Sequence, residues 1–265
     1  MKDKTFLITG TSSGIGYALA QYFSNAGHTV YGVSRKNPSK PYQWKQIKAD
    51  ITKEEEIKQV FTTIKEETNQ IDVLINCAGM GYAGALEDTS LDDITYLFQV
   101  NVFGSLMMSN YALPLLRNSE DARIINIGSV ASEITIPFQT LYSMSKSAMY
   151  RMSEGLRMEL KPEHIQVTTV LPGDTKTDFS TNRSLLTKES SRYYKRAKKS
   201  VDKMALDEEK GMHVDSVVKV VSRQLSKKRM NVYVSVGLKY KVFVWLSHVL
   251  PSKLREMLIY KIYAS

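Results

Sequence analysis

The sequence predicts an α/β fold, with one doubly wound and mostly parallel β-sheet that carries helices on both faces. Short runs rich in valine, isoleucine and leucine alternate with longer stretches of helical periodicity, and a glycine-rich turn follows the first run. The chain has 265 residues, 43% of them hydrophobic, which is enough for one sizeable core. We therefore expect a single domain over residues 1–237, followed by a basic amphipathic helical tail over residues 238–265.

Seven short apolar runs are the candidate strands of this sheet. Their hydrophobicity is continuous rather than alternating, which is typical of parallel strands buried on both faces. They are Thr5–Thr9, Val30–Ser34, Gln46–Ala49, Val73–Asn76, Arg123–Ile127, Gln166–Val170 and Asn231–Val236.

Helix start and stop signals lie between the strands. Thr52 and Glu55 form a capping-box pattern before an apolar helical stripe, and Ser90 with two following aspartates predicts another helix start. A long helix is expected over residues 141–160, because Pro162 cannot continue it.

Two segments depart from the alternation of strands and helices. Residues 174–212 are polar and basic, and an insertion of this length is usually functional, so we expect a substrate-binding loop there. The tail after residue 237 mixes aromatic, aliphatic and basic residues, and Pro251 divides it into two short helices.

The glycine-rich turn runs from Thr9 to Gly16 with the spacing G-x-x-x-G-x-G. Its glycines allow a tight turn and a close approach of backbone to a pyrophosphate, and the following helix presents free N–H groups and a favourable dipole to that anion. Its place between a strand and a helix predicts dinucleotide binding by a Rossmann-like fold.

Six segments in this order resemble the short-chain dehydrogenase/reductase family over about residues 4–237. Cys77 replaces the second asparagine of the family's N-N-A-G segment. The segments are the TGxxxGxG turn, Asn76-Cys77-Ala78-Gly79 after the fourth strand, Asn101 in the next helix, Ser129 at the end of the fifth strand, Tyr142-Ser143-Met144-Ser145-Lys146, and Pro172-Gly173 followed by Thr177.

The resemblance implies an oxidoreductase with Asn101, Ser129, Tyr142 and Lys146 as its catalytic residues. Tyr142 and Lys146 are four residues apart on a helix, so they share a face, and a lysine cation nearby is expected to lower the pKa of a tyrosine from about 10. By the family's roles, Tyr142 is the general acid or base, Ser129 binds the substrate oxygen, and Asn101 supports a water chain to Lys146. Taken singly, each residue also has an ordinary structural explanation.

The end of the second strand indicates NADP(H) rather than NAD(H). Ser34 stands where an acidic residue would select NAD, and the planar guanidinium of Arg35 suits a 2′-phosphate, with Lys36 as a second charge. Asp50 matches the family's adenine-contacting aspartate, or it caps the following helix. The predicted cofactor residues are Gly10, Ser12, Ser13, Gly14, Ile15, Gly16, Arg35, Lys36, Asp50, Ile51, Asn76, Ala78, Gly79, Tyr142, Lys146, Pro172, Gly173, Thr175 and Thr177.

Met80 and Phe138 are predicted to contact the substrate, together with Ser129 and Tyr142. The residues after the catalytic motifs are largely apolar, which favours a lipid-like or steroid-like ketone, although core packing explains them equally well. We expect an NADP(H)-dependent enzyme that interconverts a carbonyl and a secondary alcohol. A reductase of carrier-bound 3-ketoacyl groups and a non-catalytic NADP(H)-binding sensor or membrane-associated scaffold are the alternatives.

Positive charge is concentrated in the last third of the chain. Residues 1–182 have a net charge of −3 and residues 183–265 have one of +12. Such a region is either a solvated surface or a contact for an anionic partner, and nucleic acid is not expected because no binding motif accompanies the charge. For the tail, membrane contact is one interpretation. A lid over the pocket, or packing against another subunit, is the interpretation we favour.

The histidines, the single cysteine and the methionines bear on metal binding, compartment and oligomeric state. The four histidines lack metal-ligand spacing, so no metal is expected. The single cysteine and the absence of a signal-like start predict the cytoplasm, with membrane association as an addition through the tail. The resemblance implies a homodimer or homotetramer, and methionines suited to such a contact are Met107, Met108, Met149, Met152 and Met158.

Overall fold

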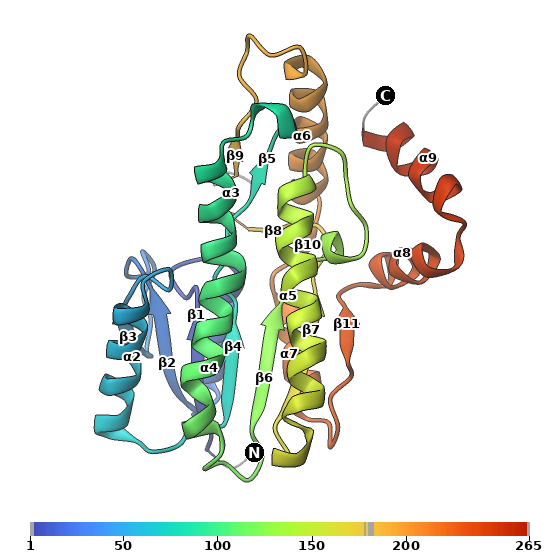
Figure 1. The fold of residues 1–265 in the computed structure, drawn as a ribbon. Coiled ribbons are helices and arrows are strands. Elements are labelled where there is room, and N and C mark those ends of the chain that lie inside the picture. The colour runs from blue at the N-terminus through green and yellow to red at the C-terminus, as the bar shows by residue number, and fades with distance from the viewer. Residues whose placement is uncertain (1–2, 178, 180–182, 264–265) are drawn as a thin grey trace.

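A computed structural model describes residues 3–177, 179 and 183–263 of the chain. Its centre is a seven-stranded sheet in the order β11-β7-β6-β4-β1-β2-β3, with every neighbouring pair parallel (Figure 1). All seven predicted strands are confirmed, with ends that differ by at most two residues. They are β1 (Thr5–Thr9), β2 (Thr29–Ser34), β3 (Lys45–Lys48), β4 (Val73–Asn76), β6 (Arg123–Ile127), β7 (Gln166–Leu171) and β11 (Tyr233–Ser235).

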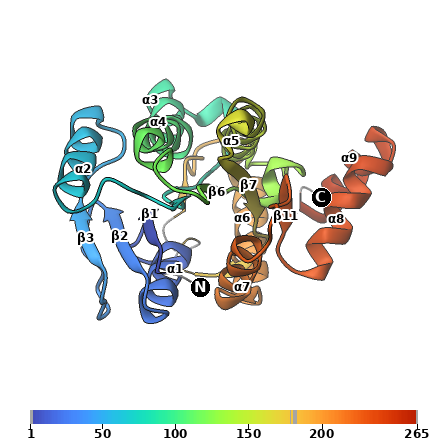
Figure 2. The same ribbon diagram turned by 90° about the horizontal axis from the view of Figure 1, so that it is seen from below.

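Helices cover both faces of the sheet, as the predicted fold class requires (Figure 2). Helices α1 (Gly14–Asn25) and α7 (Asp215–Leu225) lie on one face. Helices α2 (Glu54–Glu67), α4 (Gly104–Leu116) and α5 (Thr140–Glu159) lie on the other. Parallel strands connected in this way need such crossovers, so both faces are buried.

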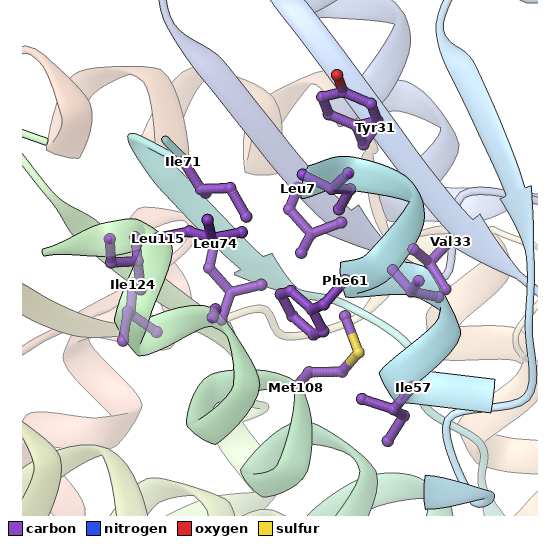
Figure 3. Close-up of a cluster of buried hydrophobic side chains, with 14 of the residues drawn as sticks. Leu7, Tyr31, Val33, Ile57, Phe61, Ile71, Leu74, Met108, Leu115 and Ile124 are labelled. Atoms are coloured by element: carbon purple, nitrogen blue, oxygen red, sulfur yellow. The ribbon is translucent and has the colours of Figure 1, made fainter. Parts of the chain in front are cut away.

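Each face has its own apolar core. Figure 3 shows the core under α2 and α4, where Leu74 of the sheet, Phe61 of α2 and Met108 of α4 pack together. On the opposite face the rings of Phe6 and Phe23 stack with their centroids 4.2 Å apart, beneath α1. An apolar layer therefore packs on each face of the sheet, and the ends of the strands remain available for a functional site.

The predicted helix starts have different outcomes. At α3 (Leu91–Phe98) the capping box is confirmed, because the Ser90 hydroxyl accepts the Asp93 N–H and the Asp93 carboxylate accepts the Ser90 N–H. At α2 the predicted box of Thr52 and Glu55 is wrong, and the helix starts without a side-chain cap. The Asp50 carboxylate accepts both the N–H and the hydroxyl of Thr52, so that hydroxyl is already engaged outside the helix.

The described residues of the insertion at 174–212 lie at the carboxyl end of the sheet (Figure 1). Its short strands pair with neighbouring segments: β8 (Thr175–Lys176) with β10 (Met212–His213), and β9 (Ser184–Leu185) with β5 (Tyr82–Ala83). Helix α6 (Tyr194–Glu209) lies between β9 and β10 in the chain. The remaining short helices are η1 (Leu86–Asp88), η2 (Gln99–Phe103), η3 (Val130–Ser132) and η4 (Lys161–Glu163).

The tail forms two helices, α8 (Leu238–Val249) and α9 (Ser252–Tyr263), with Pro251 between them as predicted. Figures 1 and 2 show both helices beyond the β11 edge of the sheet. In α8 the side chains of Tyr240, Val244 and Ser247 are buried, whereas no residue of α9 is buried.

The methionines of α4 and α5 do not form one surface. Met108 and Met149 are fully buried in the core, so they cannot contribute to the predicted subunit contact. Met158 is 70% exposed and remains available for such a contact.

Candidate active site

A cavity of about 760 Å³ lies at the carboxyl ends of β1, β2, β4, β6 and β7. Chain connections leave the sheet in opposite directions on either side of β1 and β4, and ligands of doubly wound folds bind at this switch point. Every predicted cofactor residue except Asn76 lines the cavity.

The glycine turn at the cavity floor is packed too closely to accept other residues. Gly10 has a positive φ of 77°, and a Cβ atom there would lie 2.8 Å from the backbone of Ala78. A Cβ atom on Gly16 would lie 2.2 Å from the carbonyl oxygen of Gly10. The N-cap residue of α1, Ser13, makes no side-chain hydrogen bond to the helix, so its first turn can offer N–H groups to an anion. The turn therefore fits the pyrophosphate of a dinucleotide.

The Thr9 hydroxyl joins the glycine turn to the end of β4. It accepts hydrogen bonds from the N–H groups of Cys77 and Ala78, both at 3.0 Å. This bridge between two adjacent strand ends fixes the floor of the cavity. It was not predicted, because the threonine hydroxyl carries no motif signal beyond the glycines.

Ser129, Tyr142 and Lys146 lie together at the cavity wall, as predicted. Tyr142 is hydrogen-bonded to Ser129, and the ammonium of Lys146 lies 5.9 Å from the centre of the Tyr142 ring. The Lys146 ammonium also donates to the carbonyl of Ile127 at 3.1 Å, which anchors α5 to the end of β6.

The predicted lowering of the Tyr142 pKa is wrong for this structure. Burial raises the pKa of Tyr142 to about 12, and the hydrogen bond from Ser129, which lowers it, is the smaller effect. Burial also lowers the pKa of Lys146 to about 8. The phenol is thus protonated at neutral pH, and the lysine is still mainly cationic.

Asn101 is buried behind the catalytic residues rather than exposed in the cavity. It lies in the π-helical turn η2, a form that is frequent at functional sites. Its amide accepts the N–H of Met80 at 2.8 Å and donates to the carbonyl of Met80 at 2.9 Å and to the hydroxyl of Ser145 at 3.0 Å. Asn101 therefore holds the segment after β4 against α5, and its role in a water chain stays a prediction.

Asn76 does not reach the cavity. Its side chain is fully buried and donates to Asn126 at 2.8 Å and to Ser109 at 3.0 Å. These bonds join β4 to β6 and α4. The side chain of Asn76 is thus engaged inside the core, and its predicted contact with the cofactor stays a prediction.

Arg35, Lys36 and Asp50 all line the cavity near the end of β2. The Arg35 guanidinium donates to the Tyr96 hydroxyl at 2.6 Å, and Ser34 donates to the carbonyl of Lys36 at 2.8 Å. Asp50 bonds Thr52 as described above and does not cap α2, so its predicted capping role is wrong, while its predicted contact with adenine stays a prediction.

Of the two predicted substrate residues outside the catalytic set, Met80 lines the cavity and Phe138 does not. The backbone of Phe138 is left-handed, with φ of 64°, and its ring lies 5.8 Å from the guanidinium of Arg196. Ile136 and Gln139, on either side, line the cavity instead. Residues 178 and 180–182 of the expected substrate-binding loop lie outside the described residues.

Sequence reasoning missed a buried ion pair in the wall beside Tyr142. The Phe179 and Tyr142 ring centres are 5.7 Å apart, and the Arg183 guanidinium lies 5.7 Å from the Phe179 ring. Arg183 is paired with Glu208 of α6, and their side chains are only 3% and 14% exposed. Both charges act on Tyr142, since Arg183 lowers its pKa and Glu208 raises it. Neither residue belongs to a motif, so no sequence pattern indicated the pair.

The tail supplies the far wall of the cavity. Phe243 and Leu246 of α8 and Ile259 and Ile262 of α9 line it. The tail is fixed by Tyr240, whose hydroxyl donates to Asp174 at 2.5 Å.

The Tyr240 ring also covers Gly173. A Cβ atom on Gly173 would lie 2.3 Å from that ring, so only glycine permits the contact. The tail is therefore in contact with the loop that carries the predicted cofactor residues after Pro172.

The fold and this site define a dinucleotide-dependent oxidoreductase class, and comparison with known proteins identifies the family. The profile of the short chain dehydrogenase family matches residues 4–186, and the chain belongs to the short-chain dehydrogenase/reductase family, which uses a nicotinamide cofactor.

The chain is similar to relatives from several bacteria. It is 35% identical over 239 residues to a 3-ketodihydrosphingosine reductase of Bacteroides thetaiotaomicron, covering 89% of each chain. A short-chain dehydrogenase structure from Streptomyces avermitilis has a TM-score of 0.85 at 25% identity, over 98% of this chain and 96% of that one. A Burkholderia cenocepacia short-chain dehydrogenase in complex with NADP shares the fold, with a TM-score of 0.78 at 24% identity over 97% of each chain.

Replacing Lys146 with methionine is expected to change how stability depends on pH. The pKa of Lys146 is about 8 in the folded protein against 10.5 ordinarily, so between these values the unfolded chain binds a proton that the folded chain does not. The free energy of unfolding of the wild type should therefore rise by about 2 to 3 kcal/mol relative to Lys146→Met between pH 8 and 10. Below pH 8 the difference should be constant.

Urea unfolding at several pH values measures this difference. Lys161→Met, which removes an exposed lysine, controls for the general effect of losing a lysine. Parallel curves for the wild type and Lys146→Met across this window would contradict the assignment.

Proposed function

We propose that this protein is an NADPH-dependent reductase that converts a ketone on a long-chain, lipid-like substrate into a secondary alcohol. The observation that carries the proposal is one continuous cavity. It begins at Ser129, Tyr142 and Lys146 and continues along apolar side chains of α8 and α9. The similarity to a 3-ketodihydrosphingosine reductase supports a long-chain ketone as the substrate.

Tyr142 is the proton donor in this proposal. With a pKa of about 12, its phenol is protonated at neutral pH and can donate to a carbonyl oxygen, while a bound nicotinamide supplies the hydride. The Ser129 hydroxyl, hydrogen-bonded to Tyr142, holds the same oxygen. The Lys146 cation, 5.9 Å from the ring, favours the phenolate that remains after the transfer. A high tyrosine pKa suits the reducing direction, since oxidation requires the phenolate as a base.

The residues at the end of β2 support NADPH as the cofactor. No carboxylate follows that strand, and the Ser34 hydroxyl is engaged by the Lys36 carbonyl. Arg35 and Lys36 line the cavity there and bring two positive charges to the place where a 2′-phosphate would lie.

The ion pair of Arg183 and Glu208 places two charged groups in the cavity wall. Glu208 lines the same cavity as Tyr142, and its carboxylate raises the pKa of the phenol. A long-chain 2-amino-3-ketone carries an ammonium on the carbon next to its carbonyl. We propose that Glu208 receives this ammonium and that the alkyl chain lies along the tail.

Replacing Tyr142 with phenylalanine tests the reaction. Turnover of a long-chain 2-amino-3-ketone, followed by NADPH absorbance, should fall at least about 100-fold because the proton donor is lost. Fluorescence of bound NADPH should show that cofactor binding is retained. Tyr111→Phe, at a hydroxyl bonded to Glu54 outside the cavity, should keep full activity.

The same assay separates the rival functions. Full activity of Tyr142→Phe would disprove the mechanism. Faster turnover of carrier-bound 3-ketoacyl thioesters than of free ketones would favour the carrier-dependent reductase. NADPH binding without turnover of any ketone would favour a sensor.

Replacing Arg35 with alanine tests the cofactor preference. Loss of a charge-assisted contact to the 2′-phosphate should raise the KM for NADPH by about tenfold to a hundredfold. The KM for NADH should change little, because NADH lacks that phosphate. Lys40→Ala, at an exposed lysine outside the cavity wall, is the control. Equal losses with both cofactors would rule out this role for Arg35.

Replacing Glu208 with glutamine tests recognition of the ammonium. The kcat/KM for the 2-amino-3-ketone should fall by about tenfold to a hundredfold relative to the same ketone without its amine. The ratio between the two substrates cancels general damage from breaking the pair with Arg183. Glu209→Gln, at the exposed neighbouring residue, should leave the ratio unchanged. Equal losses on both ketones would show that Glu208 is only structural.

A further inference from the structure

Helix α8 has an apolar stripe that the domain does not cover. Leu238, Val242, Trp245 and Val249 are 78%, 45%, 61% and 54% exposed. Their spacing of four, three and four residues places them on one side of the helix. The buried residues of α8 (Tyr240, Val244 and Ser247) lie on the opposite side, because each residue turns the helix by about 100°. The helix is thus apolar on two opposite faces, and the domain buries only one.

Helix α9 extends this exposed surface. Leu254, Met257, Leu258 and Ile262 are between 40% and 58% exposed. Leu258 and Ile262 also line the cavity, as does the 43% exposed Phe243 of α8. The cavity wall and the exposed apolar surface of the tail therefore share Phe243, Leu258 and Ile262. We call these exposed apolar residues of α8 and α9 the tail surface.

The charge of the tail indicates what kind of partner the tail surface binds. Residues 238–263 contain five basic side chains and one acidic side chain, Glu256. Lys241 and Lys253 are exposed beside the apolar residues. Exposed apolar and aromatic residues interspersed with lysines are typical of helices that lie in the interface of an anionic membrane. A second copy of this chain is a poorer partner, because it would bring five further basic side chains against the first five.

We propose that the tail surface docks on an anionic lipid bilayer and lies in its interface. None of the helices that the structure describes has an apolar stretch long enough to span a bilayer, so the docking is peripheral. The apolar cavity wall would then be continuous with the lipid phase, and a long-chain substrate could pass between the two. This last step rests on the proposed function, whereas the docking itself does not.

Sedimentation of the full chain with vesicles tests the docking. Vesicles of phosphatidylcholine that contain one third phosphatidylglycerol should bind the chain at least about tenfold more tightly than phosphatidylcholine alone, and added salt should reduce the difference. The double variant Val242→Glu/Trp245→Glu should lose this binding. Leu91→Glu, at a residue of α3 that is 76% exposed, introduces a glutamate elsewhere and should bind as the wild type does.

A second variant guards against misfolding of the first. Lys241→Glu/Lys253→Glu reverses two exposed charges without changing the apolar stripe, and should weaken binding to anionic vesicles by about tenfold or more. Wild-type binding that is independent of anionic lipid, or equal binding by both tail variants and Leu91→Glu, would overturn the proposal. A wild-type dimer that the Val242→Glu/Trp245→Glu variant converts to a monomer, without vesicle binding by either, would assign the surface to a subunit contact.

Activity on a short-chain ketone keeps the two proposals apart. Val242 and Trp245 lie outside the cavity wall, so their variant should retain this activity. Retained activity without vesicle binding by the wild type overturns the docking alone. Vesicle binding without Tyr142-dependent reduction overturns the proposed function alone.

Discussion

The contact between the glycine turn and the end of β4 is the constraint on which the site depends. Gly10 lies so close to Ala78 that no side chain fits between them, and Thr9 accepts two N–H groups from the same segment. Two strands whose connections leave in opposite directions are thereby fixed at one point. The floor for the dinucleotide and the segment from Ala78 to Met80 take their positions from this contact. Asn101 then fixes Met80 against α5, which carries Tyr142 and Lys146.

Burial gives this site its acid–base character. It raises the pKa of Tyr142 and lowers that of Lys146, so each group is shifted toward its neutral form. The hydrogen bond from Ser129 and the charge of Arg183 oppose the shift on Tyr142. The result is a phenol that keeps its proton at neutral pH beside a cation that would stabilise its loss. The pKa shifts of Tyr142 and Lys146 follow from the surroundings of these two residues in the folded chain. They do not follow from the spacing of four residues in the sequence.

The sequence was sufficient where local signals determine structure. Continuous apolar runs predicted all seven strands, and the turn and helix motifs predicted Ser129, Tyr142 and Lys146 in one place. The sequence was insufficient where a side chain can form a hydrogen bond with more than one group. Thr52 bonds to Asp50 rather than capping α2, and Asn76 bonds inside the core, because the competing groups are supplied by neighbours that periodicity does not reveal.

The substrate side was the least predictable part of the site. Arg183 lies just before β9 and Glu208 lies in α6, 25 residues further along the chain, and neither belongs to a motif. Phe138 is apolar, as a residue of the cavity wall is expected to be. Its backbone is nevertheless left-handed, and it does not line the cavity. The amphipathic tail was recognisable as two helices, but its place in the cavity wall depends on the Tyr240 anchor, which only the folded chain displays.

The packing of Tyr240 on Gly173 means that the tail is not a removable appendage. The ring and hydroxyl of one α8 residue hold the backbone at Gly173 and the carboxylate of Asp174, immediately before Thr175 and Thr177. A chain cut at residue 237 would retain every family motif and still lose the support of that loop. Attempts to isolate a minimal nucleotide-binding domain, or to exchange tails between relatives, must therefore treat Gly173 and Tyr240 as a single unit.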